Sequence, residues 1–249
     1  MELRTLVRDC LYLNWALPVR WLPEPPRPLH YDRQPWQGED HAFVSLLLFR
    51  QQGLRLTALP LPRLSYPQCN FRFNTRGGDT APSVLFTSLL VPYWVVPGAR
   101  WIGRQPAAAA RFDYPTPTRD GGGNCWRWAV RRREHGFAVR AHPDDPVPPS
   151  APSLGGWEET VRYFRVRPVG YSLLAGRLQR IQTSHPGVAV CPVRVEVEED
   201  GLLLHLLPPP QGERWPPIHS AFLCPEVPFT FELAGAAAPP VPRQAPAPG

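Results

Sequence analysis

The sequence contains no lysine. Its 249 residues include 27 basic side chains, and every one of them is arginine. Lysine supplies the amine that forms a Schiff base with a carbonyl substrate, and a lysine with a lowered pKa can act as a general base. Abundant arginine, alanine, proline and glycine are typical of a GC-rich genome, which accounts for the missing residue type. The absence excludes every mechanism that runs through a lysine side chain.

Patterns that bind metals or cofactors are also missing. The five cysteines are widely spaced without a CxxC pair, and the histidines form no HxH or HExxH pattern. P-loop, GxGxxG and GxSxG sequences are absent as well. We therefore expect no metal ion and no cofactor. We interpret the cysteines as buried free thiols in a reducing cytoplasm.

Neither a membrane segment nor a nucleic-acid surface is indicated. The longest apolar stretch, residues 84–96, contains Pro92 and is too short to span a bilayer. The formal net charge is +6, but the arginines are scattered, and the one dense run, Arg131–Arg133, is followed directly by Glu134. We therefore expect a soluble, cytoplasmic protein that binds neither a membrane nor a nucleic acid.

The sequence is instead rich in proline, with 35 residues, and in tryptophan, with 9. Proline breaks helix interiors, so long helices should be scarce and short strands with proline-marked turns are favoured. The hydrophobic fraction of 43% is sufficient for a substantial core. The composition predicts a mainly β (α+β) fold in one domain over residues 1–235, followed by a flexible Ala/Pro-rich tail over residues 236–249.

The clearest local pattern is a predicted hairpin. Residues 66–74 alternate, which places Asn70 and Arg72 on one strand face and Phe71 and Phe73 on the other. A Gly-rich turn follows, and residues 83–90 form the second strand. The hairpin therefore combines a polar face with an apolar face.

Other segments are less regular. Residues 157–164 carry apolar side chains at helical spacing, and residues 99–102 and 107–110 are compatible with short helices. Residues 188–198 alternate as a strand does, and residues 202–207 are predicted to pair back on them as the second strand of a hairpin.

Several motifs, in order along the chain, resemble a known family. Its members are the YqjF-like proteins (domain of unknown function 2071), which resemble acetoacetate decarboxylase in fold. The first two motifs are Tyr66-Pro-Gln-Cys-Asn-Phe-Arg-Phe-Asn74 and Val84-Leu-Phe-Thr-Ser-Leu89. The later ones are Ala99-Arg100 with Gly103 and Pro106, then Arg162-Tyr163, and then Ser184-His185-Pro186. The resemblance covers roughly residues 5–235.

This resemblance implies a compact, strongly curved antiparallel β structure, close to a closed β-barrel, that encloses a small pocket. In the decarboxylase an arginine is followed six residues later by proline and then by paired lysines, the first of which forms the Schiff base. Here Arg100 and Pro106 keep that separation, but Ala107 and Ala108 occupy the paired positions. The glutamate of the family's hairpin motif is Gln68 here.

The resemblance therefore implies a small-molecule partner, an anionic or carbonyl-containing ligand, without Schiff-base chemistry. The alternative is a non-catalytic ligand-binding or protein-interaction module on the same fold. An enzyme of this kind would perform lysine-independent, lyase- or hydrolase-like chemistry and would not be a Schiff-base decarboxylase. Whether the chain forms a homo-oligomer stays open.

Four residues are candidates for ligand binding. A guanidinium group matches planar oxyanions, so arginines that reach the pocket could hold an anionic oxygen. The alternatives are an outward-facing Arg72 and an Arg100 that ties loops together through backbone carbonyls. The candidates are Asn70, Arg72, Arg100 and Arg162.

Two residues are candidates for proton transfer. His185 is suited to acid–base work near neutral pH, although a lone histidine before proline is more often a turn residue. Tyr163 could act as a pocket acid, although packing of an amphipathic helix explains it at least as well.

Overall fold

The computed structural model describes residues 1–36, 38–59, 62–77, 81–114, 118–120, 123–143, 154–187 and 189–233. The predicted tail over residues 236–249 lies outside these ranges. The helices are a 3₁₀-helix (Val19–Trp21), α1 (Val96–Trp101), α2 (Trp157–Arg165) and α3 (Gly201–Leu206). In the described part of the chain, no helix is long and apolar enough to cross a membrane.

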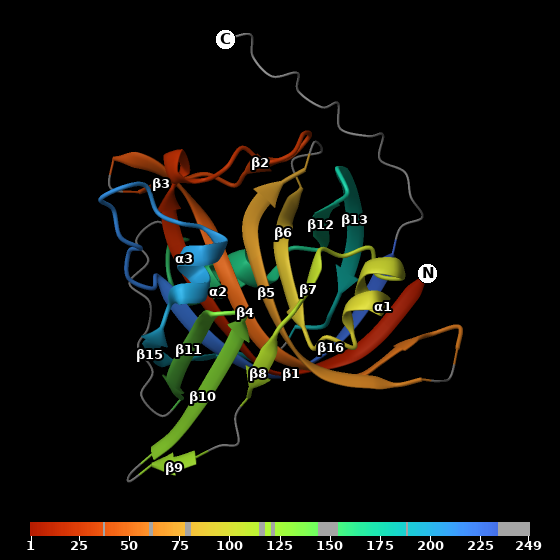
Figure 1. Ribbon diagram of the computed structural model, residues 1–249. Coiled ribbons are helices and arrows are strands. Elements are labelled where there is room, and N and C mark those ends of the chain that lie inside the picture. Colours follow the sequence, from red (N-terminus) through yellow and green to blue (C-terminus); the bar gives the residue numbers. More distant parts are fainter. Residues whose placement is uncertain are drawn as a thin grey trace.

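Strands dominate the structure, as the proline content predicts (Figure 1). The first eight strands are β1 (Glu2–Pro18), β2 (His30–Tyr31), β3 (Gln34–Trp36), β4 (Glu39–Leu56), β5 (Leu64–Arg76), β6 (Pro82–Val91), β7 (Ala107–Ala109) and β8 (Arg111–Asp113). The others are β9 (Thr118–Asp120), β10 (Gly123–Arg132), β11 (His135–His142), β12 (Val169–Leu174), β13 (Arg177–Ser184), β14 (Cys191–Pro192), β15 (Arg194–Glu199) and β16 (Ser220–Leu233).

The strands form an 11-stranded sheet and a 5-stranded sheet. The larger sheet has the order β2-β5-β4-β1-β16-β13-β12-β6-β7, and β5 also pairs with β6. Starting from β5, the pairings therefore pass through β4, β1, β16, β13, β12 and β6 and return to β5. The strong curvature that this requires is visible in Figure 1.

One feature of this sheet departs from the antiparallel expectation. β12 pairs with β6 in parallel, and so does β7. Parallel neighbours need a crossover connection, and here α1 lies between β6 and β7 while α2 lies between β6 and β12. The curved, mainly β architecture is confirmed, but the sheet is mixed.

The two faces of the large sheet have different coverings. On one face, Leu13 and Phe71 share a core with Trp128 of β10, Val139 of β11 and Leu202 of α3. The smaller sheet therefore packs against this face. The opposite face is covered near one end by α2, where Phe164 packs against Phe43 and Phe222, and each of these rings is no more than 1% exposed.

Two short elements differ from the sequence prediction. Residues 107–110 are not helical, because the backbone of β7 pairs with β6, and this tertiary pairing outweighs the helix propensity of alanine. Residues 202–207 do not form a strand. The amides of Leu203 and Leu204 donate to the carbonyl of Asp200, which begins α3. The three consecutive leucines 202–204 lack the alternation of a strand exposed on one side.

Candidate functional site

A β-bulge in β1 determines which of its side chains enter the curved sheet. Asp9 has φ of 52°, and the register between β1 and β4 shifts at this point. The extra residue changes the alternation, so that Val7 before the bulge and Cys10 and Tyr12 after it all line one cavity. Period-two alternation without the bulge would send the later side chains to the opposite face.

β5 supplies polar side chains to the same space. Gln68, Asn70 and Arg72 line the cavity, while Phe71 and Phe73 point into the core shared with the smaller sheet. Both faces of β5 are thus buried. The two faces predicted from the alternation are present, and the polar face is the one that lines the cavity.

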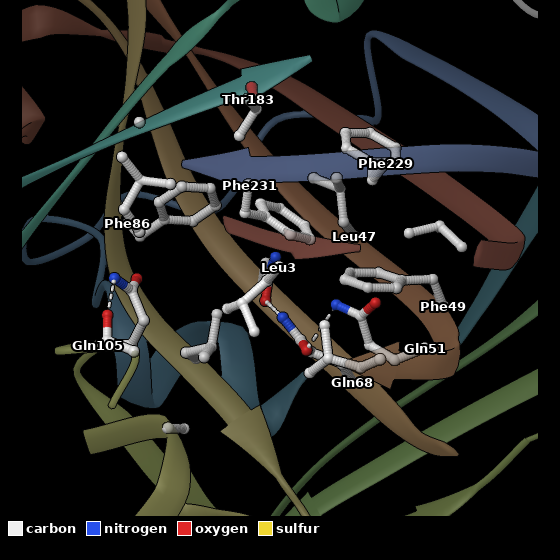
Figure 2. A pocket seen from close by; sticks show the side chains of 18 of the residues that line it. Leu3, Leu47, Phe49, Gln51, Gln68, Phe86, Gln105, Thr183, Phe229 and Phe231 are labelled. Carbon is white, nitrogen blue, oxygen red and sulfur yellow. Dashed lines mark hydrogen bonds between the residues drawn. The ribbon is translucent and has the colours of Figure 1, made fainter. Parts of the chain in front are cut away.

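The cavity has a volume of about 440 Å³, which is within the usual range for small-molecule sites. Its walls include residues from every strand that joins β5 round to β6. Figure 2 shows four phenylalanine rings around the amide groups of Gln51 and Gln68. The rings belong to Phe49, Phe86, Phe229 and Phe231.

The amides form a short hydrogen-bonded chain. Gln51 Nε2 donates to Gln68 Oε1 at 3.3 Å, and Gln68 Nε2 donates to Asn70 Oδ1 at 2.8 Å. All three side chains are buried, and Gln51 Oε1 has no hydrogen-bond partner. A buried acceptor left unpaired costs about 1–3 kcal/mol, so a ligand that donates to it gains from the contact.

Arg72 lines the cavity together with three other arginines, Arg55, Arg165 and Arg167. It is only 8% exposed, Nη2 donates to the Phe164 carbonyl at 3.1 Å, and the guanidinium lies 5.4 Å from the centre of the Tyr12 ring. Its Nε has no hydrogen-bond partner. No carboxylate of the described residues forms an ion pair with Arg72. Burial lowers the pKa of Arg72, which reflects the cost of holding an unpaired charge away from water.

The other titratable groups of the cavity are mainly hydrogen-bond donors. Burial raises the pKa of Cys10, of Tyr12 and of Tyr66, so all three stay protonated near neutral pH. His185 also lines the cavity. Its Nδ1 lies 3.0 Å from the Pro186 carbonyl and its Nε2 lies 3.4 Å from the Arg165 carbonyl.

The remaining predicted residues lie outside the cavity lining. Arg100 is exposed at the end of α1, where its Nε donates to the Ala107 carbonyl at 2.8 Å, so it ties α1 to β7 as the structural alternative predicts. Arg162 is exposed and pairs with Glu159 at 3.2 Å. The Tyr163 hydroxyl donates to the Asp32 carbonyl at 3.3 Å. Of the predicted set, the structure therefore brings Asn70, Arg72 and His185 to the cavity.

Ala107 and Ala108 lie in β7 beside β6. Ala107 is fully buried in a cluster with Tyr66, Leu89 and Val95, and Ala108 packs against the core shared by the two sheets. Their methyl groups do not line the cavity of the described structure.

Sequence reasoning missed several polar groups of the cavity. Gln51, Gln105 and Tyr12 come from β4, the β6–β7 connection and β1, which nothing in the sequence relates to β5. Gln68 was identifiable, since it continues the alternation of Asn70 and Arg72 by one more step. In the described part of the chain, no three His, Cys, Asp or Glu side chains lie together as metal ligands would.

Comparisons with known proteins agree with this geometry. The model of the DUF2071 family, described as "Uncharacterized conserved protein (COG2071)", matches residues 5–228. No curated protein matches the chain. Among solved structures, the enduracididine biosynthesis enzyme MppR complexed with pyruvate has a TM-score of 0.55 at 12% identity, over 94% of this chain and 89% of its own.

A second solved structure is an acetoacetate decarboxylase-like enzyme from Sphingomonas wittichii RW1. Its TM-score is 0.54 at 14% identity, over 94% of this chain and 92% of its own. Identity this low shows the fold alone, and the predicted acetoacetate decarboxylase-like fold is confirmed.

Proposed function

Because this chain belongs to the DUF2071 family and has the acetoacetate decarboxylase-like fold, we propose that it binds a small anionic or carbonyl-containing molecule in the 440 Å³ cavity. The absence of lysine means that binding proceeds without a lysine Schiff base. Side chains of both sheets share one hydrophobic core, which supports a single domain over residues 1–235.

The buried, unpaired charge of Arg72 carries the proposal. A guanidinium group without a carboxylate partner is costly in a cavity, and an incoming oxyanion would remove that cost. Gln68 and Asn70 lie on the same strand face and can complete the binding of a carboxylate or carbonyl oxygen. MppR, which shares the fold, is complexed with pyruvate, a molecule that carries both groups.

Calorimetric titration with pyruvate and acetoacetate tests the proposal. We expect Arg72→Gln to weaken binding by about 10- to 100-fold, because a hydrogen bond to a charged group contributes about 1.5–3 kcal/mol. Arg100→Gln is the matched control, since Arg100 is exposed outside the cavity and should leave affinity unchanged. Equal affinities for Arg72→Gln and the unaltered protein would place the anion site elsewhere.

Borohydride reduction in the presence of a β-keto acid tests the chemistry separately. A Schiff base would be trapped as a stable adduct with a mass increase. We expect no adduct on any side chain of this sequence, because no side chain carries a primary amine. A side-chain adduct found by mass spectrometry would contradict the proposal.

The second candidate function is non-catalytic binding on the same fold. Tyr12 and Cys10 favour it, because burial keeps both protonated and therefore unable to act as bases at neutral pH. Catalysis would instead rely on His185, the one predicted proton carrier that lines the cavity. His185→Gln distinguishes the two: loss of turnover with unchanged affinity indicates proton transfer, whereas binding without turnover in the unaltered protein, with unchanged affinity in the variant, indicates a binding module.

A further inference from the structure

Four buried polar side chains of the cavity gather on two neighbouring strands. The polar floor of the cavity consists of Gln51, Gln68, Asn70 and Arg72, which are between 4% and 8% exposed. Each of these residues belongs to β4 or β5, in the middle of the large sheet. A guanidinium group and three amides that can bind an oxyanion therefore lie together in the buried part of the cavity.

The more exposed part of the cavity wall is largely apolar. We call this set the apolar collar, and all of its members are half-buried. They are Leu3, Leu54, Leu56, Leu64, Phe86, Phe229, Phe231 and Leu233. Polar side chains also reach this level, namely those of Arg55, Arg165, Thr183 and His185.

Half of the collar comes from strand ends. Leu3 is the second residue of β1, Leu233 is the last residue of β16, and Leu56 and Leu64 stand at the facing ends of β4 and β5. Leu3 pairs with Phe231 on the neighbouring strand β16. A ligand bound at the floor can therefore also contact these apolar side chains.

We propose that the ligand is an amphiphilic carboxylate that binds with its head on the polar floor and its alkyl or aryl tail against the apolar collar. This inference rests on the proposed function, since it takes Arg72 as the anchor of the head group. A small polar acid such as pyruvate would leave the collar in contact with water. An apolar tail removes that surface from water and adds to the affinity in proportion to the area buried.

The decisive measurement is affinity against chain length. We would titrate the protein calorimetrically with straight-chain carboxylates from butanoate to decanoate. Each methylene buried against the collar should tighten binding by about fourfold until the tail leaves the cavity. Arg72→Gln should weaken every member of the series by the same factor, because it removes the head-group contact and leaves the tail contacts unchanged.

Two further variants test the orientation. Phe231→Gln should reduce the gain for each methylene, and Leu3→Gln, on the neighbouring strand, serves if the first variant fails to fold. Arg100→Gln, outside the cavity, is the matched control for Arg72→Gln and should leave the series unchanged. If Arg55→Gln weakens the series while Arg72→Gln does not, the head group lies at the collar and the proposed orientation is wrong.

The outcomes separate this inference from the function on which it rests. If butanoate binds through Arg72 and longer acids bind no tighter, the proposed function stands, but the proposal of an amphiphilic ligand is wrong. If no carboxylate of the series, nor pyruvate or acetoacetate, binds the folded protein, both are wrong.

Discussion

Arg72 and Arg167 are two buried arginines in the same molecule with opposite surroundings. Arg167, 6% exposed, binds Asp32 Oδ2 at 2.7 Å and also donates to three backbone carbonyls. Arg72, 8% exposed, donates to one carbonyl and keeps Nε unpaired. A buried charge with all its partners supports the fold, whereas one without a carboxylate remains available to a ligand.

The arginines of the smaller sheet make a third case. Arg127 and Arg140 share Glu198, at 2.8 Å and 2.7 Å, on a face that is open to water. These ion pairs are solvated and screened, so each contributes little. Whether an arginine stabilises the fold, is available to a ligand or forms a weak surface ion pair thus depends on its environment.

The largest effect is expected at the buried ion pair. Arg167→Met would leave the Asp32 carboxylate buried without its main partner, and we expect the free energy of unfolding to fall by about 3–5 kcal/mol. Urea denaturation measures the change. The double variant Asp32→Leu/Arg167→Met should recover much of the loss, and a single variant that costs under about 1 kcal/mol would contradict a structural role.

A smaller effect is expected in the acid range. Burial alone would raise the pKa of Asp32, but hydrogen bonds and charges from Arg167 and Arg76 hold it below its usual value of 3.8. The unfolded state therefore binds the proton more readily, so this stability is present above about pH 4 and is lost as the pH falls through the folded pKa. Asp32→Asn should flatten the decline of the unfolding free energy between about pH 5 and pH 2. Identical slopes for the two proteins would show that the pair contributes nothing to acid stability.

Arg72→Met should change the unfolding free energy of the free protein by no more than about 1 kcal/mol. Loss of the hydrogen bond to Phe164 is offset by relief from burying an unpaired cation. Thermal and urea unfolding measure this change, with Arg167→Met measured in parallel for comparison. A loss as large as that of Arg167→Met would mean that the two arginines have the same role.

The smallest effect is expected on the smaller sheet. Arg140→Ala breaks one exposed ion pair, and Glu198 keeps its contact with Arg127. We expect the free energy of unfolding, measured with urea, to fall by less than about 1 kcal/mol, and by less still at high salt. A larger loss would show that this surface pair contributes more than exposed ion pairs usually do.

Part of the cavity is predictable from local pattern. The alternation of residues 66–74 places Asn70 and Arg72 on one face, and one further step adds Gln68. Pattern fails at Leu202–Leu207, where a leucine-rich run interrupted only by His205 suits a buried helix as well as a strand. It fails again at Ala107–Ala109, where pairing to β6 outweighs local propensity.

The sequence by itself determined that no lysine is available and that polar residues share one face of β5. Composition and period-two alternation are properties of the chain alone. Only the tertiary structure decided that this face lines a cavity, because both faces of β5 are buried. It also decided that Arg167 meets a carboxylate and Arg72 does not, since Asp32 lies 135 residues from Arg167 and only folding brings the two charges together.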